Sequence, residues 1–238
     1  MSKQLGILFK PEMVRAILEG RKTQTRRGIP EEAMFVASSY IEQGCEQVSG
    51  RDESGNALIS FNTPSGQSHV LFGKWAKGDY LYVKEAWWSY GYSEETGEAT
   101  KSGKAKKKWK MAWEGAVFLD QKKPPMQSGL TDNFKWRKMS SLFLRKDDAR
   151  IWLKVTNVRV ERLLDISEAD AIAEGIISHK GVPGEYPSET MYKDYLGTSC
   201  VISPIHSYFT LWDSINGVGS HKENCWVWVI EFERCEKP

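Results

Sequence analysis

The chain has 238 residues, of which 40% are apolar and 27% charged, and this composition is typical of a soluble globular protein. It has no apolar run of about 18 residues, which excludes a membrane-spanning helix. A formal net charge of +2 excludes a surface that is basic throughout, so a nucleic-acid-binding surface must be local.

The sequence offers no sign of a disulfide framework, a metal site or a targeting segment. The four cysteines are far apart without a CxxC pair, and the four histidines are equally scattered, so we expect neither metal nor organic cofactor. The first residues, MSKQLGILFKPEM, lack the apolar core and cleavage site of a signal peptide. We therefore expect a cytoplasmic protein.

The first elements are a short strand and a helix. Residues 5–9, LGILF, read as a buried strand. Residues 11–19 form a helix, because Pro11 suits its first turn and Gly20 its end. The basic stretch EGRKTQTRR, residues 19–27, thus starts where this helix ends.

The middle of the chain is rich in turn-forming residues. Residues 28–68 are predicted to be a long excursion with one hairpin around DESGNALISF, and 78–88 a strand after a Gly-Asp turn. The polar, lysine-rich residues 91–108 are predicted to be a flexible loop. WKMAW at 109–113 is a predicted strand, followed by a loop containing KKPP.

The last third has the clearest elements. Residues 150–163 are dense in β-branched residues and predict a strand. A helix follows in DISEADAIAEGI, with Ser167 and Asp170 resembling a capping box, and another over 203–216. The apolar run CWVWVIEFER predicts a central strand, so the fold class is α+β: a small curved sheet or barrel flanked by helices.

Lys22 and Thr25 form a candidate catalytic pair. A threonine hydroxyl becomes a nucleophile when a base removes its proton, and a lysine is such a base when its pKa is lowered. Arg21, Arg26 and Arg27 favour a neutral Lys22 by like-charge repulsion. The alternative is a phosphate-binding loop in which the threonines donate hydrogen bonds.

Three other features admit a functional and a structural interpretation. Glu174 stands at a helix C-terminus, where an acid is locally unfavourable, and is either selected for function or a surface residue. The lysines of 101–110 either follow a nucleic-acid backbone or are merely solvated. Glu85 and Trp87 end a strand, where Trp87 either stacks on a base or belongs to the core. Trp212, Trp226 and Trp228 are expected in the core.

Four segments together resemble the ASCH domain, most closely the longer ASCH proteins of bacteriophages and prophages. They are ILFKPEMVRAILEGRKTQTRR, KGDYLYVKEAWW, LKVTNVRVERLLDISEADAIAEGI and YFTLWDSING with WVWVIEFER, and they cover about half of the chain. The phage-type relatives have a proline-rich WRPS…MPR segment where this chain has WRKMSSLFLRKDDAR, which retains Trp136, Arg137 and Arg145.

The resemblance implies a PUA-like fold, a small β-barrel with helices around it. It implies one domain, residues 1–238, with insertions near 28–70, 88–148 and 178–202. A compact bacterial branch of the family hydrolyses N(4)-acetylcytidine with a lysine and a threonine of the GRKTxT motif and a glutamate in the helix after the long strand. These residues match Lys22, Thr25 and Glu174.

The leading hypothesis is therefore an amidohydrolase for N(4)-acetylcytidine or a related acylated cytosine. The partner would be a nucleoside, single-stranded RNA or a modified base in DNA, with no membrane involved. The alternatives are a non-catalytic RNA- or base-binding module, a ribonuclease, or an accessory phage protein that acts on a host protein. The expected substrate contacts are Arg21, Arg26, Arg27, Glu85, Trp87, Trp136, Arg137 and Arg145.

Overall fold

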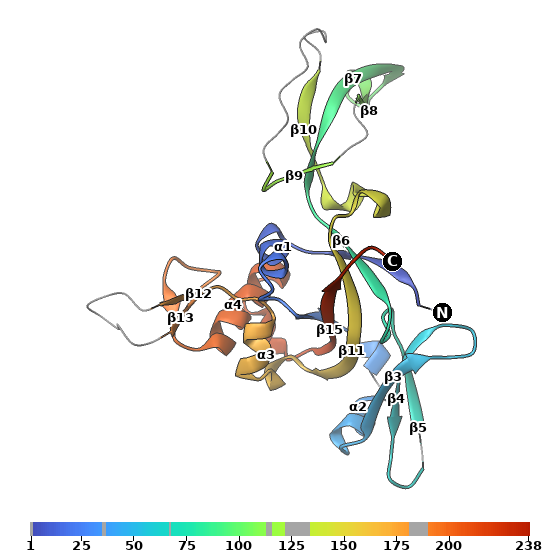
Figure 1. The fold of residues 1–238 in the computed structure, drawn as a ribbon, viewed down its shortest axis with the longest axis vertical. Helices are drawn as coiled ribbons and strands as arrows, with labels where there is room; N and C mark the ends of the chain where they lie inside the picture. Colours follow the sequence, from blue (N-terminus) through green and yellow to red (C-terminus); the bar gives the residue numbers. More distant parts are fainter. Residues whose placement is uncertain (1, 35–36, 67, 113–115, 122–133, 181–189) are drawn as a thin grey trace. The chain divides into compact units, whose positions relative to one another are not determined.

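The computed structural model describes residues 2–34, 37–66, 68–112, 116–121, 134–180 and 190–238. It is a mixed α+β structure in which strands predominate, as the sequence predicts (Figure 1). The longer helices are α1 (Pro11–Leu18), α2 (Ala37–Glu42), α3 (Glu168–Ala173) and α4 (Pro204–Asn216). Short 3-10 helices cover Glu31–Met34, Ser141–Phe143, Lys146–Asp148, Leu163–Asp165 and Ser220–Glu223.

The strands form four sheets. A five-stranded sheet has the order β1 (Gln4–Leu8), β6 (Tyr80–Lys84), β11 (Trp152–Arg162), β15 (Trp226–Cys235) and β2 (Gln24–Gly28). A second sheet has β7 (Trp87–Ala99) between β10 (Lys135–Met139) and β8 (Ala105–Met111), with β9 (Val117–Phe118) also paired to β7. The third sheet contains β3 (Glu46–Arg51), β4 (Ala57–Asn62) and β5 (Ser68–Phe72). The fourth contains β12 (Ser178–Lys180), β13 (Thr190–Lys193) and β14 (Cys200–Val201).

The apolar terminal run lies inside its sheet, as predicted. β15 pairs antiparallel with β11 on one side and with β2 on the other. Val227, Val229 and Ile230 are fully buried, and the three tryptophans expected in the core, Trp212, Trp226 and Trp228, are buried as well. Burial on both faces explains why the first half of the strand, Trp226–Ile230, is entirely apolar.

The predicted helix ends are confirmed at three places. Ser203 caps α4 by accepting a hydrogen bond from the His206 amide, and Gly217 follows the helix with φ +117°. Ser167 caps α3 by accepting one from the Asp170 amide. Gly20 has φ +74° after α1, a conformation that glycine adopts without a Cβ clash.

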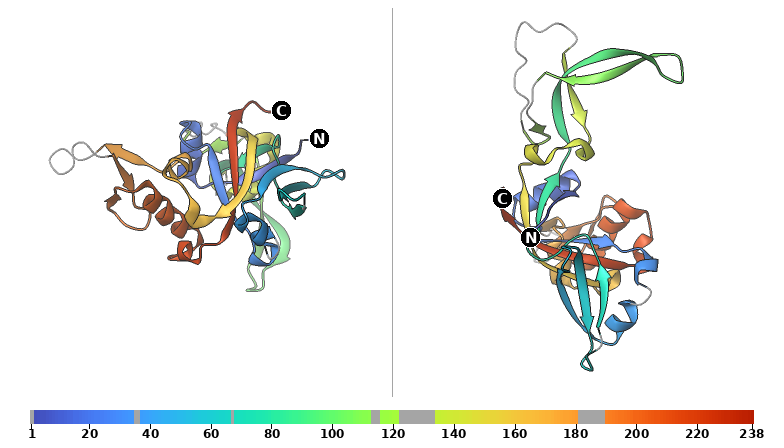
Figure 2. Two further views of the ribbon diagram at one scale, coloured as in Figure 1. Left: turned by 90° about the horizontal axis from the view of Figure 1, so that it is seen from below. Right: turned by 90° about the vertical axis from the view of Figure 1, so that its right-hand side faces the viewer.

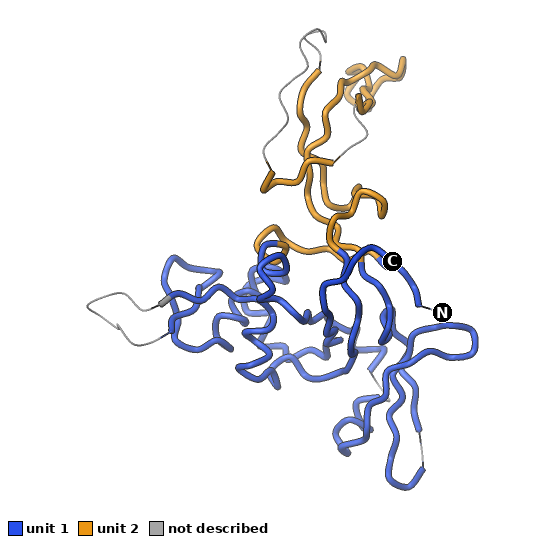
Figure 3. Tube along the Cα trace, in the orientation of Figure 1, with its two compact units in different colours: residues 1–5, 15–81, 152–238 blue, residues 6–14, 82–151 orange. Residues whose placement is uncertain are grey.

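The chain divides into two compact units (Figure 3). The first comprises residues 1–5, 15–81 and 152–238, and the second comprises 6–14 and 82–151. Within residues 28–68 the predicted hairpin around DESGNALISF is the β3–β4 pair, and β5, which begins at Ser68, adds a third strand. Helix α2 contacts β4 and β5 (Figure 2).

The prediction of a flexible loop over 91–108 is wrong. These residues extend β7 and, after a turn, enter β8, which pairs with β7 and contains most of the predicted strand 109–113. Cross-strand ion pairs Lys106–Glu98, Lys107–Glu95 and Lys110–Glu94 explain how a polar sequence forms a hairpin. Trp113 and the KKPP segment lie outside the described residues.

The sheets are not closed into a barrel, so the expected PUA-like barrel is not established by the pairing of the described strands. Within the same described ranges, no helix is both long and apolar enough to cross a membrane. The four cysteines are free thiols.

Asp79, from the predicted Gly-Asp turn, is fully buried in the first unit. Its carboxylate accepts hydrogen bonds from the amides of Lys3 and Ala76, each at 2.9 Å, and from the Arg51 guanidinium. Asp79→Ala leaves these donors without their acceptor, so we expect the free energy of unfolding to fall by about 3–5 kcal/mol in urea titrations followed by circular dichroism. Asp52→Ala, at a turn carboxylate that is not buried and accepts from Asn56, should lower it by much less. Equal losses in the two variants would contradict this role for Asp79.

Candidate functional site

The basic motif after α1 forms an edge strand rather than a loop. Lys22 makes an isolated antiparallel bridge with Glu174, and Gln24–Gly28 then pair with β15 as β2. Thr23 continues the extended backbone, because its amide donates to the Ala173 carbonyl and its carbonyl accepts from the Phe232 amide. Side chains of an extended segment alternate between two faces, so Lys22, Gln24 and Arg26 share one face.

Lys22 and Glu174 are in direct contact although 152 positions separate them. Lys22 Nζ lies 2.7 Å from Glu174 Oε2 and 2.8 Å from the Glu174 carbonyl oxygen. Both side chains are almost entirely buried, at 2% and 4% exposure. Glu174 is therefore not the exposed surface residue of the structural interpretation: the C-terminal end of α3 turns its carboxylate inward.

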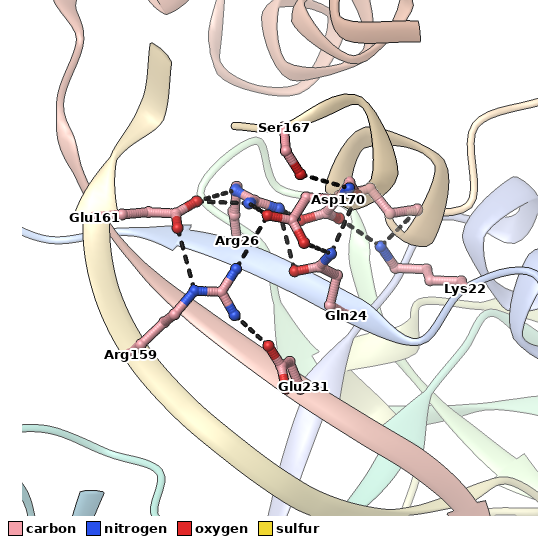
Figure 4. A network of polar contacts seen from close by, with 9 residues as sticks. Lys22, Gln24, Arg26, Arg159, Glu161, Ser167, Asp170 and Glu231 are labelled. Atoms are coloured by element: carbon pink, nitrogen blue, oxygen red, sulfur yellow. Dashed lines mark hydrogen bonds and ion pairs between the residues drawn. The ribbon is translucent and has the colours of Figure 1, made fainter. Parts of the chain in front are cut away.

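Arg26 links this pair to further carboxylates (Figure 4). Its guanidinium lies 3.2 Å from Glu174 Oε1, 2.5 Å from Glu161 Oε1 and 3.2 Å from Asp170 Oδ2. Gln24 donates to Asp170 Oδ1 at 2.7 Å, which orients that carboxylate. The Arg26 side chain is fully buried, so these contacts replace its lost hydration.

The network continues toward solvent through Arg159. This guanidinium contacts Glu161, Asp170 and Glu231. Exposure rises along the series, from 0% for the Arg26 side chain to 26% for Arg159 and 37% for Glu231. We call this set the ion-pair network: Lys22, Gln24, Arg26, Arg159, Glu161, Asp170, Glu174 and Glu231.

Burial shifts the pKa values of two groups at the Lys22 end of the network. Burial lowers the pKa of Lys22, and Arg27 and Arg26 lower it further, whereas Glu174 opposes the shift. Tyr208 of α4 lies against Arg26, with the guanidinium carbon 5.7 Å from its ring centre. Burial, followed by the Glu174 charge, raises the pKa of Tyr208 well above its ordinary value. A lysine with a lowered pKa next to a carboxylate is a combination suited to proton transfer.

Thr25 lies in β2 between Gln24 and Arg26, so strand alternation directs its side chain to the opposite face from Lys22. It is 4% exposed and stands across from the fully buried Ile230. The structure thus brings Lys22, Glu174 and Arg26 together and places Thr25 on the other side of the same strand.

The neighbouring arginines have separate surroundings. Arg21 is partly exposed and contacts Glu19 and the carbonyls of Gly175 and Ile176. Arg27 shares the face of Thr25 by alternation and is partly buried.

The remaining expected contacts lie in the second unit. Glu85 holds Arg150 through two hydrogen bonds, and Trp87 is buried with Phe118 and Leu144, which agrees with its interpretation as a core residue. Arg137 lies over the Trp109 ring, Arg145 pairs with Asp148, and the Trp136 ring packs against Tyr90 at a tilted angle.

The sequence analysis missed Gln24, Arg159, Glu161, Glu231 and Tyr208. Three of them carried a signal. In VRVER, Arg159 and Glu161 alternate with buried valines, and Glu231 is the first charge after the apolar run Trp226–Ile230. Charged side chains on one face of a central strand require partners.

The described part of the chain has no group of three or more His, Cys, Asp or Glu side chains able to hold a metal ion. In comparisons with known proteins, no family model, no curated protein and no solved structure matches this chain.

Gly175 permits the Lys22–Glu174 contact. Its φ is +84°, and a Cβ at this position would lie 2.7 Å from Lys22 Cβ and 2.9 Å from Ala16 Cβ. We expect Gly175→Ala to lower the free energy of unfolding by more than Gly44→Ala, measured by urea titration. Gly44 has φ +72° with nothing within 4 Å of the added Cβ, so its variant should cost only the conformational term of about 1–2 kcal/mol. Equal costs would show that Gly175 is needed for its backbone conformation alone.

Proposed function

We propose that the protein is an amide hydrolase whose substrate is N(4)-acetylcytidine or a related acylated cytosine. The observation that carries the proposal is the buried contact of 2.7 Å between Lys22 Nζ and Glu174 Oε2. These are two of the three residues that the ASCH resemblance pairs in catalysis. The proposal includes a PUA-like architecture for the first unit.

In this reaction the neutral Lys22 amine removes the proton from the attacking oxygen. The Glu174 carboxylate relays this proton from the Lys22 ammonium to the departing N4 of cytosine, and the Arg26 guanidinium stabilises the negative charge that forms on the acyl oxygen. One water is consumed, and cytidine and a carboxylate are released. The neutral amine is favoured because burial lowers the pKa of Lys22.

The attacking oxygen is assigned to water. The resemblance implies Thr25 as the nucleophile, but strand alternation in β2 directs that hydroxyl away from Lys22.

A second candidate function is base or RNA binding without turnover. The observation that favours it is that the Lys22 ammonium already donates to two oxygens of Glu174, as a structural cation does. The more exposed end of the network, Arg159 with Glu161, Asp170 and Glu231, offers donors and acceptors to the edge of a base.

Lys22→Met should reduce cytidine formation from N(4)-acetylcytidine by about 10²–10⁴-fold, because the proton acceptor is lost. Cytidine is followed by liquid chromatography, and circular dichroism checks the fold. Glu174→Gln should give a similar loss, and Lys154→Met, at an exposed lysine of β11, should have no effect. Turnover that survives in Lys22→Met rejects the assignment. A wild-type protein that binds cytidine derivatives but forms no product supports the second candidate.

Thr25→Val tests whether the attacking nucleophile is water or the Thr25 hydroxyl. Valine has nearly the shape of threonine without the hydroxyl, and we expect the variant to retain turnover because water attacks. Loss of turnover in a folded variant would make Thr25 the nucleophile. Thr25→Ser serves as the control, since it keeps the hydroxyl.

The pH dependence follows from the sign of the Lys22 shift. The protonated ammonium is inactive as a base, so kcat/KM should rise with pH and level off at a pKa below the ordinary lysine value. The measurement is a pH–rate profile in constant ionic strength. A rate that falls as pH rises over this range would contradict a neutral Lys22.

A further inference from the structure

The sheet of the second unit carries a large excess of positive charge, although the net charge of the whole chain is small. Residues 87–111 and 134–139, which contain β7, β8 and β10, have nine Lys or Arg against three Glu, a formal charge of +6. The rest of the chain has 24 Lys or Arg against 28 Asp or Glu, a formal charge of −4. The net charge of +2 therefore hides a basic sheet on an otherwise acidic protein.

Strand register places aromatic rings and lysines on the same face of this sheet. Trp88, Tyr90 and Tyr92 alternate along β7. Their register partners are Lys138 for Trp88, Trp136 for Tyr90 and Lys110 for Tyr92, and Lys108 follows opposite Glu94. Directly opposed residues of an antiparallel pair point to the same side, so these side chains form one surface.

The rings on this surface contact one another. The ring centres of Tyr90 and Trp136 are 5.1 Å apart, and those of Tyr92 and Phe134 are 4.9 Å apart. Trp88, Tyr92, Phe134 and Trp136 are all partly exposed, so their rings are not sealed in the core as Trp87 is on the other face. We call this surface the aromatic face: Trp88, Tyr90, Tyr92, Phe134 and Trp136 with Lys108, Lys110 and Lys138.

Partly exposed rings flanked by lysines are the combination by which proteins hold single-stranded nucleic acid. Bases stack on the rings, while cations follow the phosphates. A duplex keeps its bases stacked on each other and cannot use the rings. On the opposite face the ring of Trp109 is covered by Arg137, and Lys107 pairs with Glu95 as Lys110 pairs with Glu94 on the aromatic face.

We propose that the aromatic face binds single-stranded nucleic acid. We infer a nucleic acid rather than a peptide from the charge. A peptide partner would have to be strongly acidic to match +6 and would gain little from a row of ring faces. This surface is separate from the ion-pair network, and binding here does not depend on whether that network hydrolyses an acyl group.

The test is fluorescence anisotropy of the full chain with a labelled 12-nucleotide oligouridylate, a labelled oligothymidylate and a labelled 12-base-pair duplex. We expect the single strands to bind at least tenfold more tightly than the duplex. Affinity should fall with salt, by a slope of about 0.7 per phosphate contact in a log–log plot. Equal affinity for the duplex would overturn the proposal, as would binding to neither single strand.

Matched variants locate the surface. Tyr92→Leu keeps an apolar side chain but removes the ring, and it should weaken binding by about 5- to 100-fold, the effect of losing one stacked base. Lys108→Gln should weaken binding and reduce the salt slope by about 0.7, whereas Lys107→Gln, one position away on the opposite face, should change neither. Equal effects of the two lysine variants, or none from Tyr92→Leu, would overturn the assignment to this face.

Lys22→Met distinguishes this inference from the proposed function. The variant should bind the oligonucleotides as the wild type does, even if it no longer forms cytidine. Loss of oligonucleotide binding in a folded Lys22→Met protein would place the nucleic acid on the ion-pair network and reject the aromatic face.

Discussion

The arrangement of the first unit around the basic motif depends on one buried ion pair, Lys22 with Glu174. Taking an ammonium and a carboxylate out of water is costly, and the attraction between them offsets that cost only when the remaining donors and acceptors are also satisfied. Here the Glu174 carbonyl accepts from the same ammonium, and Arg26 occupies the second carboxylate oxygen. The pair thereby fixes the end of α3 against the start of β2.

The rest of the ion-pair network follows from that burial. A buried Arg26 needs carboxylates, which Glu161 and Asp170 supply, and these in turn hold Arg159 near the surface. Solvent exposure therefore increases along the network, from the buried Lys22 to the partly exposed Glu231. Such a gradient gives one end the shifted pKa useful in proton transfer and the other end the access that a ligand needs.

The second unit uses charge in a different way. Its hairpin lysines are exposed, and several of them are balanced by glutamates on the neighbouring strand. These exposed pairs stabilise little individually, yet together they allow a polar segment to extend a sheet. The excess of lysine over glutamate leaves a local positive surface beside aromatic rings, which the overall net charge conceals.

Sequence alone determined the elements whose signals are local. The caps of α3 and α4, the end of α1 at Gly20 and the central position of β15 were predicted because capping hydroxyls, positive-φ glycines and apolar runs act over a few residues. The sequence also identified Lys22 and Glu174 as candidate site residues. Lys22 was identified from its motif, and Glu174 from its unfavourable position at a helix C-terminus.

Only the tertiary structure decided which of these residues meet. Lys22 reaches Glu174 because an extended segment pairs with the end of a helix 152 positions away, and no local pattern specifies that register. The same extended backbone directs Thr25 to the opposite face from Lys22, although the sequence suggested that the two form a catalytic pair. The lysine-rich hairpin was missed for a related reason: its strands are stabilised by partners across the turn, so their own composition reads as loop.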